Sequence, residues 1–210
     1  MSPLRWLCWP QSSVCGSISD SPRHGFVETK LIRSLRPNVT RDEALQMFNA
    51  RGAAAFLWRL RSGPLQRIAE AYLPFHLYRV RYHTGRADRS HLFALDAVDG
   101  TLDLYEFSLP PGEPETVIVA TRNHPLPRLS ATKAEELVRE KVLRLIFQQG
   151  FFKVRGMKLE IERLPDEIHL PYWLAFYGTR ENLRCRVMDA VRRRIEGARA
   201  SALFEQWLAT

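Results

Sequence analysis

Two aspartates open an identical tripeptide, and they are the first residues whose chemistry could be enzymatic. The chain reads LFALDAV around Asp96 and CRVMDAV around Asp189. Two carboxylates held close together push their pKa values apart, which lets one act as a general acid and the other as a general base. Asp also precedes turns and helices, where its carboxylate accepts hydrogen bonds from backbone amides. We expect this second, structural role at both positions.

Other patterns that signal catalysis or metal binding are absent from the sequence. It contains no glycine-rich nucleotide loop, no Gly-x-Ser-x-Gly elbow and no His-Glu-x-x-His helix. The histidines form no His-x-His or His-x-x-x-His pair, and the three cysteines have no Cys-x-x-Cys spacing. We therefore expect no catalytic residues, no metal site and no cofactor, in a protein that is not an enzyme.

Arginines are concentrated near the C-terminus. Seven occur between residues 180 and 199, where three acids leave a formal charge of +4. They are Arg180, Arg184, Arg186, Arg192, Arg193, Arg194 and Arg199. The run from Arg192 to Arg194 is expected in the first turn of a helix, where positive charge opposes the helix dipole and a bound phosphate or acidic partner would relieve the repulsion. The cluster is a candidate nucleic-acid-binding face, and a solvated surface is the competing interpretation.

Composition limits the class of protein. The chain has 210 residues, of which 45% are hydrophobic, and a formal net charge of +8. This length suits one domain or two small ones, each with its own core. Arg supplies 26 of the 31 basic residues, a bias that a GC-rich coding sequence produces without selection for phosphate binding. The apolar stretches are shorter than the roughly 20 residues that a membrane span needs, so we expect a cytoplasmic protein.

Two predicted helices begin with Thr and Glu at the spacing of a capping box, in which each side chain accepts from the other residue's backbone amide. The pairs are Thr40 with Glu43 and Thr132 with Glu135. Each helix is expected to end at a glycine, Gly52 or Gly150, that can take the left-handed conformation. Helical spacing of apolar residues predicts a short helix over residues 26–35. It also predicts a C-terminal helix that follows Asp189, which could cap it, and that carries an apolar stripe from Ile195 to Trp207.

The motif Leu-Pro-x-x-Leu occurs twice, as LPFHL from Leu73 and as LPYWL from Leu170. Both copies follow a predicted helix and a strand-like segment, and both precede Asp-Ala-Val at nearly the same spacing, which predicts a tandem duplication. Because Pro lacks an amide proton, each motif is expected to begin a strand or to lie at a sheet edge. The copies differ at His76 and Trp173, which makes these two residues candidate binding residues.

The chain divides into four predicted segments. These are a disordered leader (1–25), a first α+β repeat (26–108), a proline-rich linker that contains the strand-like TVIVA (109–130), and a second α+β repeat with a C-terminal helix (131–210). Each half contains a helix followed by an antiparallel meander, so the expected fold class is α+β. One face of each meander must lie on a helix, and the other face needs a second cover.

The stretch ALDAVDGTLDLYEF resembles the strand, turn and hairpin of the cystatin-like and PepSY-like families. The matching residues are Leu95, Asp96, Ala97, Asp99 and Gly100. The second half keeps Asp189 and Ala190 but lacks the glycine and the hairpin. The resemblance implies two cystatin-like units that bind or inhibit other molecules and have no chemistry of their own.

Two functions of different classes follow from these features. The first is a non-catalytic binding or assembly module that holds a protein partner over an exposed sheet face or edge. The alternative is a nucleic-acid-binding protein that uses the basic face from Arg180 to Arg199. A small-ligand pocket lined by His76 and Asp96 is a third option. The sequence predicts no oligomeric state.

Overall fold

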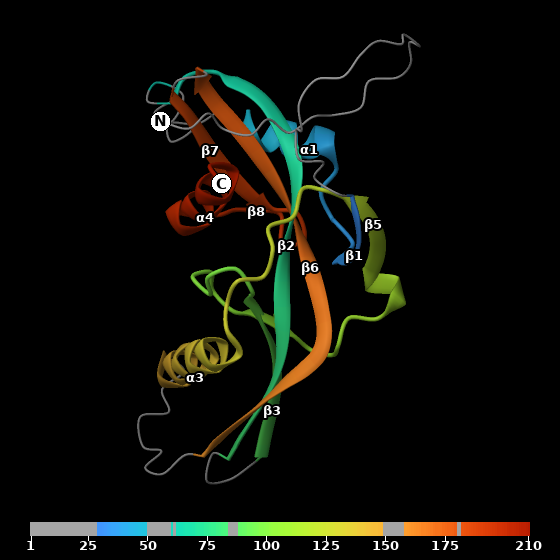
Figure 1. Cartoon of the computed structure of the whole chain (residues 1–210), viewed down its shortest axis with the longest axis vertical. Helices are drawn as coiled ribbons and strands as arrows, with labels where there is room; N and C mark the ends of the chain where they lie inside the picture. Colours follow the sequence, from blue (N-terminus) through green and yellow to red (C-terminus); the bar gives the residue numbers. More distant parts are fainter. Residues whose placement is uncertain (1–28, 50–59, 61, 84–87, 149–157, 180–181) are drawn as a thin grey trace, which may run out of the picture.

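The computed structural model describes residues 29–49, 60, 62–83, 88–148, 158–179 and 182–210. These residues form an eight-stranded, mostly antiparallel sheet with helices packed on it, so the predicted α+β class is confirmed (Figure 1). In the part of the chain that the structure describes, no helix combines the length and the apolar composition needed to cross a membrane.

Two long strands, β2 (Leu65–His83) and β6 (Leu159–Thr179), form the centre of the sheet and pair along most of their length. The path β4-β3-β2-β6-β1-β5 crosses the sheet, and β7 and β8 extend it beside the C-terminal half of β6. The other strands are β1 (Lys30–Leu35), β3 (Asp88–Asp96), β4 (Tyr105–Phe107), β5 (Thr116–Thr121), β7 (Asn182–Asp189) and β8 (Arg194–Ile195). The helices are α1 (Arg41–Phe48), α3 (Ala131–Gln148) and α4 (Ala198–Leu208), with a 3-10 turn η1 (Glu113–Glu115) before β5.

The two Leu-Pro-x-x-Leu motifs pair with each other at the middle of β2 and β6. Leu73 lies opposite Leu170, so Pro74 lies opposite His169 and Pro171 lies opposite Tyr72. The prediction that each proline begins a strand is therefore wrong, because both lie in strand interiors.

The neighbouring strands explain how a central strand accepts proline. The carbonyl of Pro74 accepts from the amide of Ala97, and the carbonyl of Pro171 accepts from the amide of Ala190. The N and C=O of one residue point to the same side of a strand, so each missing N–H faces the side where β3 or β7 has just ended at its aspartate. No ladder bond is lost at either proline.

The helices cover the two faces of the sheet in different places. Ala44 and Phe48 of α1 pack on Trp173, Ala175 and Tyr177 of β6. The apolar stripe of α3 packs on alternate residues of β2 and β3, from Tyr78 to Leu95. Figure 1 shows α1 and α3 near opposite ends of the sheet. Each of these helices lies across strands from both halves of the sequence, because Ile68 of β2 also packs with α1 and Ile161 of β6 also packs with α3.

The opposite face carries the largest cluster of buried residues, and α4 packs on part of it, mainly beside β7. Alternate residues of β2 and β6, including Leu73 and Leu170, belong to this cluster together with Ala200, Leu203 and Phe204 of α4. The predicted C-terminal helix is confirmed, but it begins at Ala198 and follows β8.

Local sequence signals predicted some of the helix ends correctly. The capping box of Thr40 and Glu43 is present, and α1 ends at Phe48 with Asn49 as its C-cap. At α3 the predicted box is wrong, because the hydroxyl of Ser130 accepts from the amide of Lys133 and the helix starts one residue earlier than Thr132. The predicted helix ends at Gly52 and Gly150 lie outside the described residues, and so does the predicted strand-like segment AAAFLWRL (53–60) apart from Leu60.

Residues 30–35 form strand β1, so the predicted helix over this region is wrong. The strand runs between β5 and β6, with Ser34 opposite both Val117 and His169. Ile32 and Ser34 are buried while Leu31 is exposed, an alternation of period two. Pairing on both sides outweighs the four-residue spacing of the leucines, which an isolated stretch would use in a helix.

Candidate binding surfaces

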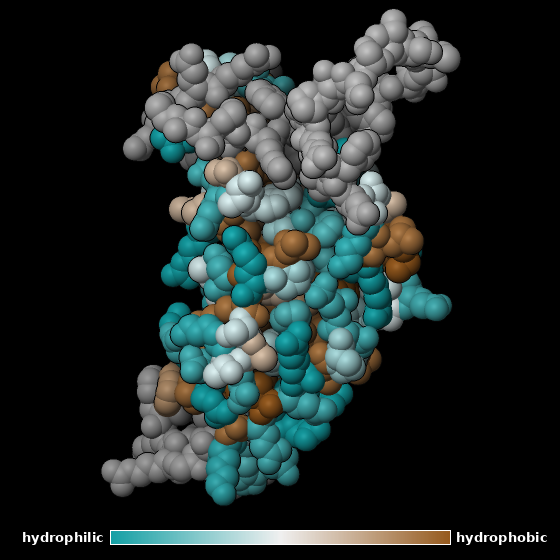
Figure 2. All heavy atoms as spheres, viewed as in Figure 1, coloured by the Kyte–Doolittle hydropathy of each residue, from teal (hydrophilic) through white to brown (hydrophobic). Residues whose placement is uncertain are grey.

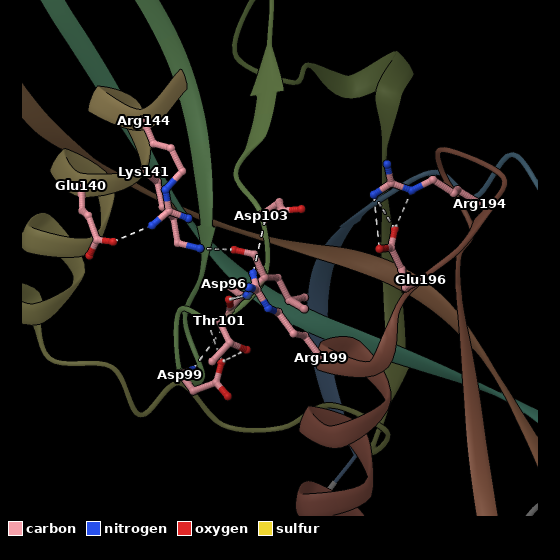
Figure 3. Close-up of polar contacts among 11 residues, drawn as sticks. Asp96, Asp99, Thr101, Asp103, Glu140, Lys141, Arg144, Arg194, Glu196 and Arg199 are labelled. Carbon is pink, nitrogen blue, oxygen red and sulfur yellow. Dashed lines mark hydrogen bonds and ion pairs between the residues drawn. The ribbon is translucent and has the colours of Figure 1, made fainter. Parts of the chain in front are cut away.

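Asp96 anchors a tight turn after β3. Its carboxylate accepts from the amides of Asp99 (3.1 Å), Gly100 (2.8 Å) and Leu102 (3.0 Å). Gly100 has a φ of 70°, which a glycine adopts without strain. Burial raises the pKa of Asp96 to about 6, although the three amide bonds favour the ionised form. The turn, drawn in Figure 3, occupies both carboxylate oxygens in backbone contacts.

Asp189 anchors the corresponding turn after β7. Its carboxylate accepts from the amides of Val191 and Arg192, both at 2.8 Å. Burial raises its pKa as well. The expected structural role of both aspartates is confirmed, but Asp189 caps a turn instead of the C-terminal helix.

The arginines of the predicted basic face do not form one surface. Arg180 lies outside the described residues. Arg184 and Arg186 lie opposite Tyr177 and Ala175, on the face that α1 covers. The arginines between residues 192 and 199 follow the Asp189 turn, and residues 192–194 precede α4, so the prediction of three cations in its first turn is wrong.

Acidic partners also offset the charge of the arginines that follow Asp189. The pairs are Arg192 with Asp189 (4.0 Å), Arg193 with Glu43 (2.8 Å), Arg194 with Glu196 (3.0 Å) and Arg199 with Asp103 (3.9 Å). The last two are visible in Figure 3. An extended phosphate backbone would have to displace several of these carboxylates at once, which weakens the case for nucleic-acid binding.

His76 and Trp173 are both buried, and they serve different parts of the core. The imidazole of His76 lies 3.1 Å from the guanidinium of Arg163, and its pKa falls to about 4 because of burial and that positive charge. The indole N–H of Trp173 donates to the carbonyl of Val39 at 3.0 Å. Neither side chain is accessible to a partner, so neither supports the binding role predicted for it.

A chain of polar groups crosses β2, β3 and β4, and the sequence analysis missed it. The hydroxyl of Tyr82 lies 3.2 Å from Nε2 of His91, whose Nδ1 lies 2.8 Å from a carboxylate oxygen of Glu106. The arrangement resembles a nucleophile, base and acid. Burial raises the pKa of Tyr82, however, which disfavours the phenolate that a nucleophile needs. Only strand register could have revealed the chain, because the three residues share no sequence spacing.

No three His, Cys, Asp or Glu side chains come together as a metal ion requires in the described part of the chain. Two other surfaces could bind a partner, namely the edges of the sheet and the region between the two aspartate turns.

β5 is the longest of the strands that end the sheet. Its partner is β1, and the amide of Arg36 donates to Glu115 at the start of this pairing. Alternation then directs the N–H and C=O groups of Val117 and Val119 toward β1, and those of Ile118 and Ala120 outward. The sequence of β5, TVIVAT, has no charge and no proline. Edge strands of this kind form new ladders readily, and most proteins protect them.

Apolar side chains are exposed on the same ribbon. Leu31 is 71% exposed and Ile118 is 64% exposed. Leu31 lies opposite Ala120 and Ile118 lies opposite Arg33, so the two side chains are diagonal neighbours on one face. Figure 2 shows hydrophobic atoms at the edge of the molecule where Figure 1 places β5. The other terminal strands, β4 and β8, have three and two residues and offer much less edge.

Comparisons with known proteins add no assignment. No family model matches the chain, and neither a curated protein nor a solved structure matches it.

Proposed function

We propose that this chain is a non-catalytic binding module that takes an extended segment of another protein as an added strand along β5. The observation that carries the proposal is the outer edge of β5, which pairs with no strand among the described residues and has outward N–H and C=O groups at Ile118 and Ala120. Strand addition draws affinity from main-chain hydrogen bonds and specificity from alternate side chains. The exposed side chains of Leu31 and Ile118 would supply the specificity.

The chemistry of this ribbon defines the partner that would fit. A β-branched, uncharged strand pairs best with another segment rich in Val, Ile, Thr or aromatic residues. Every second residue of that segment would face Leu31 and Ile118 and should be apolar. Arg33 lies on the same face as those two residues, so an acidic residue at one of these positions would add specificity.

Protein binding is favoured over the nucleic-acid alternative because the arginines after Asp189 are paired with acids and those of β7 lie on another face. The absence of catalysis and the cytoplasmic location stay predictions. The polar chain through His91 is the feature most worth assaying for turnover, because its three groups are already hydrogen bonded.

We further propose that the two halves are structural repeats of the cystatin-like kind. Three register relationships support this. Leu73 pairs with its motif counterpart Leu170. Phe75 lies opposite Asp96 as Tyr172 lies opposite Asp189. The residue after each aspartate donates its amide to the motif proline.

The strand-addition proposal is tested with peptides selected from a displayed library of extended, alternating sequences. Ile118→Pro removes an outward amide and no ladder bond to β1, whereas Ile118→Val keeps the amide and most of the side chain. We expect selected peptides to bind wild type and Ile118→Val, to lose binding to Ile118→Pro, and to slow hydrogen exchange of the Ile118 and Ala120 amides. Peptides that bind Ile118→Pro equally well, or that protect amides elsewhere, would refute the proposal.

A further inference from the structure

A hollow of about 400 Å³ lies between the segments that follow the two aspartate turns. One wall is the segment from Leu102 to Tyr105, and the other is the segment from Arg192 to Ala200. Phe75 and Tyr172, from the paired central strands, complete the lining. This volume falls within the range of about 300–1,000 Å³ that is typical of small-molecule sites.

Two of the arginines on the rim differ in how firmly they are held. The guanidinium of Arg192 lies 3.6 Å from the centre of the Tyr105 ring and 4.0 Å from Asp189, so stacking and charge fix it in place. Arg199 is 70% exposed and meets the exposed Asp103 only at 3.9 Å. Figure 3 shows Arg199 reaching from α4 toward Asp103. A bound anion could draw Arg199 away from that weak partner at little cost.

The hydroxyl of Tyr172 has no hydrogen-bond partner among the described residues, although the side chain is only 4% exposed. Tyr172 lines the hollow, so this hydroxyl is open to a partner that enters the hollow. Burial and the negative charges of Asp189 and Glu196 raise the pKa of Tyr172 far above its ordinary value, so the group remains a donor at neutral pH. The comparable hydroxyl of Tyr177 donates to a carbonyl at 3.1 Å. An acceptor supplied by a ligand would satisfy Tyr172.

The first turn of α4 adds further donors to the same hollow. Gly197, the N-cap, provides no side-chain hydrogen bond to the amides that follow it, and residues 197–200 line the hollow. The start of a helix carries partial positive charge and unpaired amides, both of which favour an anion.

We propose that this hollow binds a small organic anion, in which one carboxylate or phosphate is attached to an apolar body. The oxygens of the anion would lie among Arg192, Arg199 and the hydroxyl of Tyr172. The apolar body would lie on Phe75 and Leu102. This site goes beyond strand addition, because no residue of β1 or β5 lines it.

Calorimetric titration of the full chain tests the ligand class. Benzoate and phenyl phosphate carry one aromatic ring with the two head groups, benzamide is the neutral control, and inorganic phosphate lacks the ring. We expect saturable binding of benzoate, of phenyl phosphate or of both, and the head group that binds identifies the source. No saturation by either up to about 10 mM, or equal binding of benzamide, would overturn the proposal. Inorganic phosphate that binds as tightly as phenyl phosphate would overturn the role of the apolar lining.

Matched variants test the site. Tyr172→Phe removes an unpartnered hydroxyl, so it should weaken the anion about tenfold without lowering the unfolding midpoint. Tyr78→Phe removes another buried, unpartnered hydroxyl on the face that α3 covers and should change nothing. Arg199→Gln should weaken binding, whereas Arg193→Gln, which loses an arginine bound to Glu43, should not. Equal losses in the test and control variants would show that the site lies elsewhere.

Discussion

Leu73 of β2 lies directly opposite Leu170 of β6, and both side chains are fully buried in the largest cluster of the core. Truncation of either removes one wall of the same packed contact. Leu73→Ala and Leu170→Ala should each lower the free energy of unfolding by about 2–5 kcal/mol. The double variant should cost less than the sum, because the second truncation enlarges a cavity that already exists.

Urea denaturation of the four proteins gives the coupling between Leu73 and Leu170. Leu31→Ala is the control, since Leu31 is exposed and its truncation should stay within about 0.5 kcal/mol of wild type. Strict additivity would show that the two leucines do not share a contact.

The two aspartate turns should differ in what they contribute to stability. Asp96→Ala leaves three backbone amides without their acceptor, and Asp189→Ala leaves two. An unsatisfied buried group costs about 1–3 kcal/mol, so the loss should be larger for Asp96→Ala. Asp96→Asn keeps one acceptor oxygen and should fall between wild type and Asp96→Ala. Thermal and urea unfolding measure this order, and an equal loss in Asp96→Ala and Asp189→Ala would contradict it.

Acid should destabilise the protein through His169, which is buried where β1 meets β6. Burial is the main cause that lowers its pKa from 6.5 to about 4. Between these values the unfolded chain binds a proton that the folded chain excludes, so unfolding becomes easier as the pH falls. The contribution of neutral His169 to the free energy of unfolding is complete above pH 6.5. It declines toward pH 4, by about 3 kcal/mol at most. His169→Gln should flatten this part of the stability profile.

Asp96 titrates in the opposite sense in the same region, because burial raises its pKa to about 6. Wild type and His169→Gln share this effect of Asp96. The difference between their profiles of stability against pH therefore gives the effect of the His169 imidazole alone. Parallel profiles for wild type and His169→Gln would show that His169 is not the group responsible.

The open edge at β5 should promote self-association at high concentration. Ile118→Lys places a charge on the exposed side of the strand, which disfavours edge-to-edge pairing. Phe147→Lys replaces another exposed apolar residue, near the end of α3, and adds the same charge. Light scattering should show less association for Ile118→Lys than for Phe147→Lys, while both unfold within about 0.5 kcal/mol of wild type. Equal effects would mean that overall charge matters and the edge does not.

Signals that act within a few residues could be read from the sequence. The capping box at Thr40, the turn-forming role of Asp96 and the C-terminal helix each depend on neighbouring residues, and the structure contains all three. TVIVA was expected as a strand, and it lies within β5. In each of these cases the local preference and the tertiary environment agree.

Features that depend on pairing between distant strands could not be read in this way. The leucines of β1 have helical spacing, and only β5 and β6 make that segment a strand. The prolines were expected at strand starts because nothing local shows that β3 and β7 end beside them. In the sequence Tyr172 is one residue of a repeated apolar motif, and only the folded chain places it in the same hollow as Arg192.

The position of the two helices has a consequence for the origin of the fold. α1 packs on β6 and on Ile68 of β2, and α3 packs on β2, β3 and Ile161 of β6. On the proposed duplication, an ancestral half alone would leave part of its helix without a sheet beneath it. Two copies of that half would complete the surface under each helix, with the Leu73 and Leu170 positions meeting on the two-fold axis. Gene fusion would then have turned an obligate homodimer into one chain, leaving each half free to diverge.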